Sequence, residues 1–438
     1  MPGHTMAGLK ALRPWALALL TTCGAAGIAT PQEPPAAKKQ PVTVWFNAGV
    51  DNNLMAAMAA NVQDFQKSQD RYQIEMTLVP EGTYTDRILA AGKTGDLPCL
   101  LFFDGPLVAN LAWLGYLQPI DRFVSKQLKA DFLPSLIEQG TYNGKLYTLG
   151  NYDSGLAMYA NRKYLRAAGV RVPTVARPWN LAEFEAALEK LAAVPGVAYP
   201  LDMKINYGRG EFFTYGFSPI LQSFGGDLID RQTYQSAKGV LDGPQSVAAM
   251  KRFQSWFQKG WANPKPAGDT DFPSGKAALS WVGHWLYNKY AEALGQDLAV
   301  IPMPDFGHGP KTGLGTWNFG IPSSCQDTRG SWAFLESLLQ PDNVARWTNI
   351  HGGVPARKSA LAQSKLYRPG GPLHLYVQQI EKGWAVPRPP TPAYGAITKA
   401  FAEAVDHIIQ GADVQTELSQ AATKIDQDIQ AHNGYPAR

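Results

Sequence analysis

The chain has 438 residues, 45% of them hydrophobic and 17% charged, which excludes a disordered chain and predicts two or three folded domains. Its net charge is +4, and no cluster of Lys and Arg is dense enough to grip a phosphate backbone, so nucleic acid is not expected as a partner. The aromatic residues include 12 Trp and 18 Tyr, which fill cores and also line sites for partly polar ligands.

Residues 1–23 have the pattern of an export signal. Lys10 and Arg13 precede a short apolar run that is too short to span a bilayer. The run ends in Leu-Thr-Thr-Cys, which resembles the bacterial lipoprotein box and makes Cys23 a candidate for lipidation, although Thr before the Cys is uncommon there. The alternative is ordinary cleavage near residues 27–29, a small-x-small site.

Residues 24–41 are predicted to be a tether because the stretch "TPQEPPAAKKQP" is rich in proline. No other stretch approaches the 18 apolar residues that a membrane helix needs. The mature protein is therefore expected outside the cytoplasm, in the periplasm or attached to the cell envelope. Membrane contact would come only through an N-terminal lipid anchor.

The next part of the chain alternates between strands and helices. A strand is expected where apolar residues run together or alternate, and a helix where they recur at helical spacing. The strands expected are 42–49, 72–80 and 99–106, and the helices are 52–68, 83–95 and 107–115. This order predicts a parallel sheet covered by helices on both faces.

The stretch "GNYDSGLAMYANRKYL" (150–165) places an aromatic residue, an acid and a hydroxyl before an alternating strand. A second α/β region follows over about 155–275, with helices at 161–169 and 181–193. Strands then return at 279–284 and 298–304, and the chain is mostly helical from Ser331. The first region is thus revisited after the second, which predicts two lobes joined by several crossing strands, with a ligand cleft between them.

Two cysteines remain after Cys23. Export permits a disulfide between Cys99 and Cys325. Their positions in the sequence do not show whether they meet, and two separate buried thiols are the simpler interpretation. Neither a CxxC motif nor a metal-ligand spacing occurs in the sequence, so no metal is expected.

Five segments together resemble the extracellular sugar-binding proteins of bacterial ABC importers, the maltose-binding-like group. They are "YTDRILAAGKTGDLPCLLFFDGP", with Cys99 where the family usually has Asp, "LAWLGYLQPID", "YNGKLYTLGNYDSGLAMYANRKYLRAAGV", "FPSGKAALSWVGHW" and "SWAFLESLLQPDNVARW…HGGVPARKSAL". None is specific alone, but they occur in the family's order and spacing from about residue 42 to 425.

The resemblance implies the α/β fold of a type II periplasmic binding protein, with two lobes and a ligand cleft between them. We expect one lobe to comprise 42–152 plus 280–320 and the other to comprise 153–279 plus 321–438. Crossings between the lobes are expected near 152–156, 279–284 and 318–322.

A sugar presents pairs of hydroxyls, which a carboxylate or amide holds well, and apolar faces, which lie on aromatic rings. Contacts with a sugar are therefore expected at strand ends and in crossings. The candidate ligand-binding residues are Asn47, Asp51, Glu81, Asp104, Tyr152, Asp153, Trp285, Gly315, Trp317, His351, Arg357 and Trp384.

Several of these residues have a structural alternative. Asp104 matches a family position where an acid commonly meets sugar, but it is also placed to cap the following helix. Asp153 is either a ligand contact or an acid that bonds the backbone of a crossing. Trp285 matches the family's Gly-x-Trp ring, and Gly315 would let a ligand approach the backbone closely.

The implied function is that of the substrate-binding component of an ABC transporter. It would capture a sugar as a monomer, without a cofactor or catalysis, and deliver it to a membrane permease. Two alternatives stay open. One is a secreted glycoside hydrolase, which also needs carboxylates and aromatic rings. The other is a binding protein for a different solute, such as a glycerol phosphodiester or a polyamine.

Overall fold

Strand β3 (Leu100–Asp104) lies at the centre of the first of two sheets in the computed structural model, which describes residues 38–48 and 52–437. Its side chains alternate between two cores: Leu100 and Phe102 pack on one face, Leu101 and Phe103 on the other. A strand buried on both faces reads as a continuous apolar run, which is why this segment was recognisable in the sequence.

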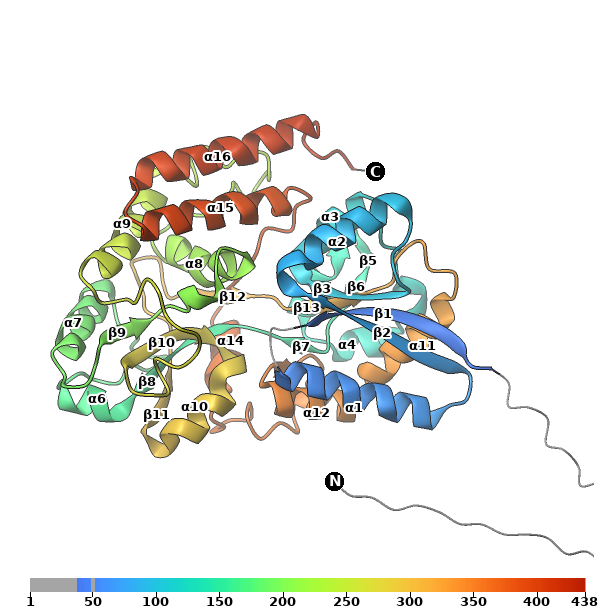
Figure 1. Ribbon diagram of the computed structural model, residues 1–438, viewed down its shortest axis with the longest axis horizontal. Coiled ribbons are helices and arrows are strands. Elements are labelled where there is room, and N and C mark those ends of the chain that lie inside the picture. Colours follow the sequence, from blue (N-terminus) through green and yellow to red (C-terminus); the bar gives the residue numbers. More distant parts are fainter. Residues whose placement is uncertain (1–37, 49–51, 438) are drawn as a thin grey trace, which may run out of the picture. The chain divides into compact units, whose positions relative to one another are not determined.

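The first sheet has the order β2-β1-β3-β13-β6 (Figure 1). Strands β1 (Gln40–Ala48), β2 (Tyr72–Pro80) and β3 are parallel, and β13 (Trp317–Gly320) runs antiparallel to β3. The short strand β6 (Thr148–Leu149) pairs with β13. The parallel sheet predicted from the sequence is therefore present, with β13 and β6 added at one edge through antiparallel pairings.

Helices cover both faces of this sheet. The core on one face includes side chains of α1 (Asn52–Ser68), α11 (Thr328–Leu338) and α12 (Pro341–His351). The core on the other face includes side chains of α2 (Glu81–Thr94) and α3 (Val108–Trp113). We call this sheet and its helices the first lobe.

The second sheet has the order β11-β8-β10-β9. Its strands are β8 (Leu156–Asn161), β9 (Tyr199–Asp202), β10 (Ala277–Gly283) and β11 (Leu298–Ile301), and β8 lies antiparallel to both β10 and β11.

The core of the second sheet is completed by helices. It includes side chains of α7 (Leu181–Ala192), α8 (Glu211–Ser223), α9 (Pro244–Gln258), α15 (Tyr394–Ile409) and α16 (Val414–Ala431). We call this part the second lobe. The described helices and strands of both lobes belong to one compact unit.

The chain crosses between the lobes in three places. The first crossing joins β6 to β8 and contains β7 (Tyr152–Asp153), which pairs with β14 (Val354–Pro355). The second joins β12 (Thr312–Leu314), which contacts β8 and α8, to β13. The third lies between α13 (Lys358–Leu361) and α14 (His374–Glu381).

The predicted lobe boundaries need correction. Residues 280–320 were expected in the first lobe, but β10 and β11 pair within the second sheet and only β13 returns to the first. Residues 321–438 were expected in the second lobe, but α11 and α12 pack with α1 in the first. Of the expected crossings, 152–156 fits, whereas 279–284 lies inside the second sheet and 318–322 follows the true crossing.

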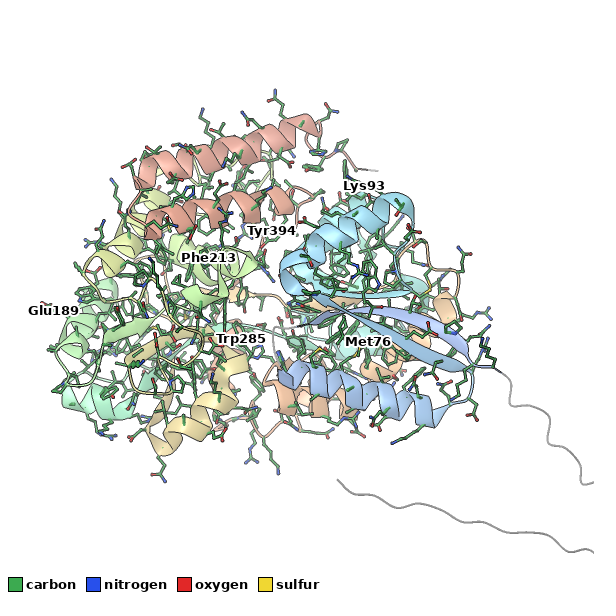
Figure 2. All side chains as sticks on the ribbon, in the orientation of Figure 1. Met76, Lys93, Glu189, Phe213, Trp285 and Tyr394 are labelled. Carbon is green, nitrogen blue, oxygen red and sulfur yellow. A yellow bond between two sulfur atoms is a disulfide. The ribbon has the colours of Figure 1, made fainter. Side chains whose placement is uncertain are left out.

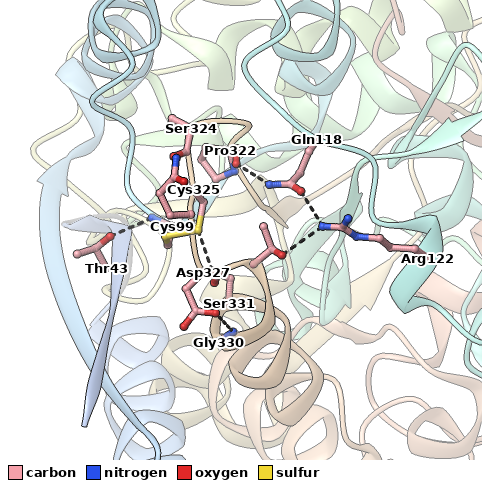
Figure 3. The surroundings of a disulfide bond; sticks show 12 residues. Thr43, Cys99, Gln118, Arg122, Pro322, Ser324, Cys325, Asp327, Gly330 and Ser331 are labelled. Carbon is pink, nitrogen blue, oxygen red and sulfur yellow. Dashed lines mark hydrogen bonds between the residues drawn. A yellow bond between two sulfur atoms is a disulfide. The ribbon is translucent and has the colours of Figure 1, made fainter. Parts of the chain in front are cut away.

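Cys99 and Cys325 form a disulfide with a Cα–Cα distance of 4.7 Å (Figure 3). It joins the residue before β3 to the segment between β13 and α11, and the 226-residue stretch that it closes contains the whole second sheet. The backbone amide of Cys99 donates to Thr43 Oγ1 on β1 at 3.0 Å. The interpretation of two separate thiols was wrong because the antiparallel pairing of β13 with β3 brings the two residues together.

Candidate functional site

A buried ion pair joins the lobes where β3 ends. Arg388, which follows β15 (Ala385–Pro387), donates from both terminal nitrogens to the two carboxylate oxygens of Asp104, at 2.7 and 2.8 Å. The Arg388 side chain is only 5% exposed. Strand β15 pairs with β12, which contacts β8 and α8 of the second lobe. The bidentate contact therefore links an acid of the first lobe to an arginine that lies against the second lobe.

A second acid completes this group. Glu211, the first residue of α8, accepts from Arg388 Nη1 at 2.5 Å and from Thr398 Oγ1 at 2.7 Å. It also accepts a hydrogen bond from the hydroxyl of Tyr394, the first residue of α15. Two carboxylates therefore share one guanidinium, which leaves the group with an excess of negative charge.

Burial and the neighbouring charges shift the pKa values of Arg388 and Glu211 in opposite directions. Burial alone would lower the pKa of Arg388, but the charges of Asp104 and Glu211 outweigh it and raise that pKa. Burial raises the pKa of Glu211, and the charge of Arg388 opposes this only in part. The guanidinium thus stays charged and is the element that holds both acids in place.

Aromatic rings lie next to this ion group on the second lobe. The guanidinium carbon of Arg388 lies 5.0 Å from the centre of the Tyr215 ring. Trp285, which is labelled in Figure 2, follows β10. Its ring lies 6.3 Å from that of Tyr215, and its Nε1 donates to Tyr207 Oη at 2.9 Å. A Cβ on Gly283 would come within 1.9 Å of the Trp285 ring, so only glycine lets the indole take this position.

The first lobe contributes rings of its own. Trp317, which opens β13 and pairs in register with Asp104, stacks on Tyr84 with ring centres 5.9 Å apart. Its ring also lies 5.5 Å from that of Phe102. Trp317 is partly buried: it packs against the core and remains partly accessible to solvent.

Asn47 lies at the end of β1, next to β3. It is 2% exposed, and both atoms of its carboxamide lack a hydrogen-bond partner among the described residues. A buried amide normally has partners, because an unpaired one costs free energy. Asn47 is therefore suited to meet the hydroxyls of a ligand held at this edge of the first sheet.

Asp153 lies in the first crossing but is bonded within the protein. Its carboxylate is 0% exposed and accepts from Ser135 Oγ at 2.5 Å, from the Ser154 amide at 2.8 Å and from the Gly315 amide. Burial raises its pKa to about 6, and these hydrogen bonds limit the rise. The contacts match the structural alternative, an acid that ties two crossings together.

The neighbouring predicted residues form a buried cluster. The rings of Tyr152 and His351 lie 4.6 Å apart, and that of His284 lies 4.9 Å from His351. Burial lowers the pKa of His351 to about 3, so this imidazole is neutral at physiological pH. Ser154 Oγ connects His284 Nε2, at 3.1 Å, to Tyr215 Oη, at 2.9 Å, which couples the crossing to the aromatic group.

Other predicted residues lie elsewhere or at the margin. Arg357 donates to Asp131 Oδ2 at 2.7 Å and to the Leu339 carbonyl at 2.8 Å, so it stabilises the first lobe rather than facing the ion group. Trp384 is partly buried just before β15, and its carbonyl accepts from the Thr312 amide.

Gly315 has φ +116°, and a Cβ there would lie 3.2 Å from Arg388 Nη2. The close approach expected of this glycine is therefore made to Arg388. Glu81 begins α2, but its side chain lies outside the described residues, as do Asp51 and Cys23.

Sequence reasoning missed Arg388, Glu211 and Tyr215. The signals available were weak: an arginine alone in the Pro-rich stretch "AVPRPPTP", and an acid directly after Gly210 at a helix start. Within the described ranges, no helix is long and apolar enough to cross a membrane. No group of three or more His, Cys, Asp or Glu residues there is arranged to hold a metal ion.

Comparison with known proteins identifies the family. The model of the family described as bacterial extracellular solute-binding protein matches residues 60–368. The chain belongs to this family. Its two lobes and their topology are those of the type II periplasmic-binding-protein fold.

Individual relatives are distant but extend over most of the chain. A maltotriose-binding protein of Pyrococcus abyssi is 22% identical over 410 residues, which are 89% of this chain and 82% of that protein. The GacH receptor of Streptomyces glaucescens, whose crystal structures include complexes with acarbose, superposes with a TM-score of 0.75 at 22% identity, covering 90% of this chain and 98% of that one.

A solute-binding protein of Thermotoga lettingae, solved with α-D-tagatose, is also similar. It gives a TM-score of 0.77 at 22% identity, covering 89% of this chain and 99% of that chain. These superpositions support the fold assignment over nearly the whole of each compared protein.

Proposed function

We propose that this protein is the substrate-binding component of an ABC transporter, which captures a sugar between its two lobes and delivers it unchanged to a membrane permease. The observation that carries the proposal is the combination of Asp104, Arg388 and Glu211 with the rings of Trp285 and Trp317, drawn from both lobes. Carboxylates and a guanidinium bind hydroxyl pairs, and indole rings bind the apolar face of a pyranose.

The proposed contacts divide between the lobes. The first lobe offers Asp104, Asn47 and Trp317, and the second offers Trp285 and Glu211. A ligand that touches both sets gains all of these contacts only when the lobes are closed, so it shifts the population toward the closed form. Asp153 is proposed here to position Gly315 and the first crossing rather than to contact the sugar.

Related proteins narrow the sugars to test first. They include a protein named for maltotriose and proteins whose structures were solved with acarbose, tagatose and mannobiose. A thermal-shift screen of these sugars and of shorter and longer glucans is the direct test, because a ligand that binds only the folded state raises the melting temperature. Failure of every sugar to raise it would refute the proposal.

The same screen separates the alternatives. A polyamine or a glycerol phosphodiester in the panel would raise the melting temperature if either were the solute. Chromatography of each sugar after incubation tests for hydrolysis. We expect every sugar to be recovered intact, since we propose that the chain binds without catalysis.

We further propose that the protein acts outside the cytoplasm as a monomer, with the export signal removed and Cys23 as the site of a lipid anchor. Mass spectrometry of the protein recovered from membranes tests the anchor. A diacylated Cys23 is expected as the first residue, and a first residue near 30 would instead show ordinary cleavage.

A further inference from the structure

The residues that follow α16 lie against the first lobe. Helix α16 belongs to the second lobe, where Ile425 and Ile429 are part of the core. Helix α3 belongs to the first lobe, where Val108 and Leu111 are part of the core. Figure 1 shows the C-terminal end of the chain extending from α16 toward α3. The chain thus makes a contact between the lobes in addition to its three crossings.

This contact is centred on Trp113 at the end of α3. Its Nε1 donates to the Pro436 carbonyl at 2.9 Å. Its ring lies 4.9 Å from that of Tyr435 and 5.9 Å from that of His432, edge to face in both cases. The Trp113 side chain is buried, with a relative exposure of 6%. Edge-to-face packing and a buried hydrogen bond together form a specific contact.

The C-terminal segment is built to present these groups. The rings of His432 and Tyr435 stack 4.6 Å apart, and Tyr435 Oη donates to Asp428 Oδ2 at 2.6 Å. Asn433, Gly434 and Tyr435 all have positive φ, at 53°, 74° and 55°. The two non-glycine residues, Asn433 and Tyr435, adopt this conformation only where other contacts offset its cost.

Helix α3 makes a second contact with the second lobe close by. Asn110 Nδ2 donates to the Pro392 carbonyl at 2.8 Å, just before α15 begins at Tyr394. Tyr394 in turn bonds Glu211 of the ion group. The contact at Trp113 is therefore on the side of the molecule where the ion group joins the lobes.

We propose that residues His432–Pro436 are a clasp that holds the two lobes together and so regulates access to the proposed sugar site. Opening the lobes requires Trp113 to leave Tyr435 and Pro436. The clasp therefore favours the closed arrangement even without ligand, and part of the affinity for the ligand comes from this bias. The regulatory role rests on the proposed function, whereas the effect on lobe opening does not.

The test compares full-length variants in the absence of sugar. Trp113→Ala and Tyr435→Ala each remove one of the two rings that meet between the lobes. Phe123→Ala is the matched control, because Phe123 stacks on Trp332 at 5.3 Å within the first lobe. Small-angle X-ray scattering gives the radius of gyration, and thermal unfolding confirms that each variant is folded.

We expect a larger radius of gyration in both clasp variants, from a fall of about tenfold in the ratio of closed to open molecules, the size expected for losing an aromatic pair. The double variant should open no further than Trp113→Ala, which already removes every contact of the indole ring, and Phe123→Ala should leave the radius unchanged. An unchanged radius in folded Tyr435→Ala, or an equal rise in the control, would overturn the proposal.

Binding then distinguishes this proposal from the proposed function. If the wild type binds a sugar, Tyr435→Ala should bind it several-fold more weakly, since its closed form is less populated. If no sugar binds the wild type while the clasp variants still open, the sugar proposal fails and the clasp stands. If sugar binds the wild type and the clasp variants keep the radius of the wild type, the clasp proposal fails and the sugar proposal stands.

Discussion

Replacing Arg388 by Met is expected to destabilise the protein strongly. The guanidinium is 5% exposed and bonds Asp104 at 2.7 and 2.8 Å and Glu211 at 2.5 Å. Removing one partner of a buried ion pair costs about 3–5 kcal/mol, because a charge is left without compensation. Here two carboxylates are left facing each other, so we expect the loss at pH 7 to lie in that range.

The loss of unfolding free energy in Arg388→Met should become smaller as the pH falls. In the Met variant, Glu211 loses the charge that lowers its pKa, which burial already raises, so the pKa rises further. A group with a raised pKa in the folded state contributes stability below its unfolded pKa and loses it as pH rises through the folded value. The stability difference from the wild type should therefore narrow as pH falls from 7 toward about 4.

Urea unfolding of the wild type, Arg388→Met and Arg388→Lys at pH 7 and pH 5 measures this effect. The Lys variant keeps the charge without the bidentate geometry, so its loss should be smaller and nearly independent of pH. A loss below about 1 kcal/mol for the Met variant, or the same loss at both pH values, would refute the assignment of Arg388 as the holder of both acids.

Three further outcomes follow from the structure. Asp153, with its pKa raised from 3.8 to about 6, should contribute about 3 kcal/mol of stability below about pH 3 that is lost by about pH 7, and Asp153→Asn should abolish this pH dependence in urea unfolding. Reducing the Cys99–Cys325 disulfide should lower stability by about 2–4 kcal/mol, so a melting temperature unchanged by dithiothreitol would contradict its structural role. Trp285→Ala should weaken sugar binding roughly tenfold, and unchanged affinity of the folded variant by calorimetry would remove Trp285 from the site.

Local patterns in the sequence were sufficient to predict the three parallel strands of the first sheet. The apolar run of β3 and the alternation of β2 depend only on which faces are buried. Asp104 was predicted as a site residue for the same reason, because an acid that ends a buried parallel strand stands at the edge of the sheet where ligands generally bind in such folds.

Pairings between distant segments could not be predicted in this way. Arg388 lies 284 residues from Asp104 along the chain, and nothing in the sequence near either residue specifies the other. Strand β10 was assigned to the wrong lobe because its apolar pattern fits either sheet, and only its pairing with β8 decides between them. The disulfide went unrecognised because it depends on the pairing of β13 with β3.

The measurement that tests the central claim most directly is a calorimetric titration of the best sugar from the thermal-shift screen into the wild type and into Asp104→Asn. We expect saturable binding of one sugar per chain, with the sugar recovered unchanged, and an affinity at least roughly tenfold lower in the variant, the scale of a lost charge-assisted hydrogen bond. Equal affinity in both proteins, or shorter sugars released during the titration, would contradict the claim that the lobes capture a sugar at Asp104 and pass it on intact.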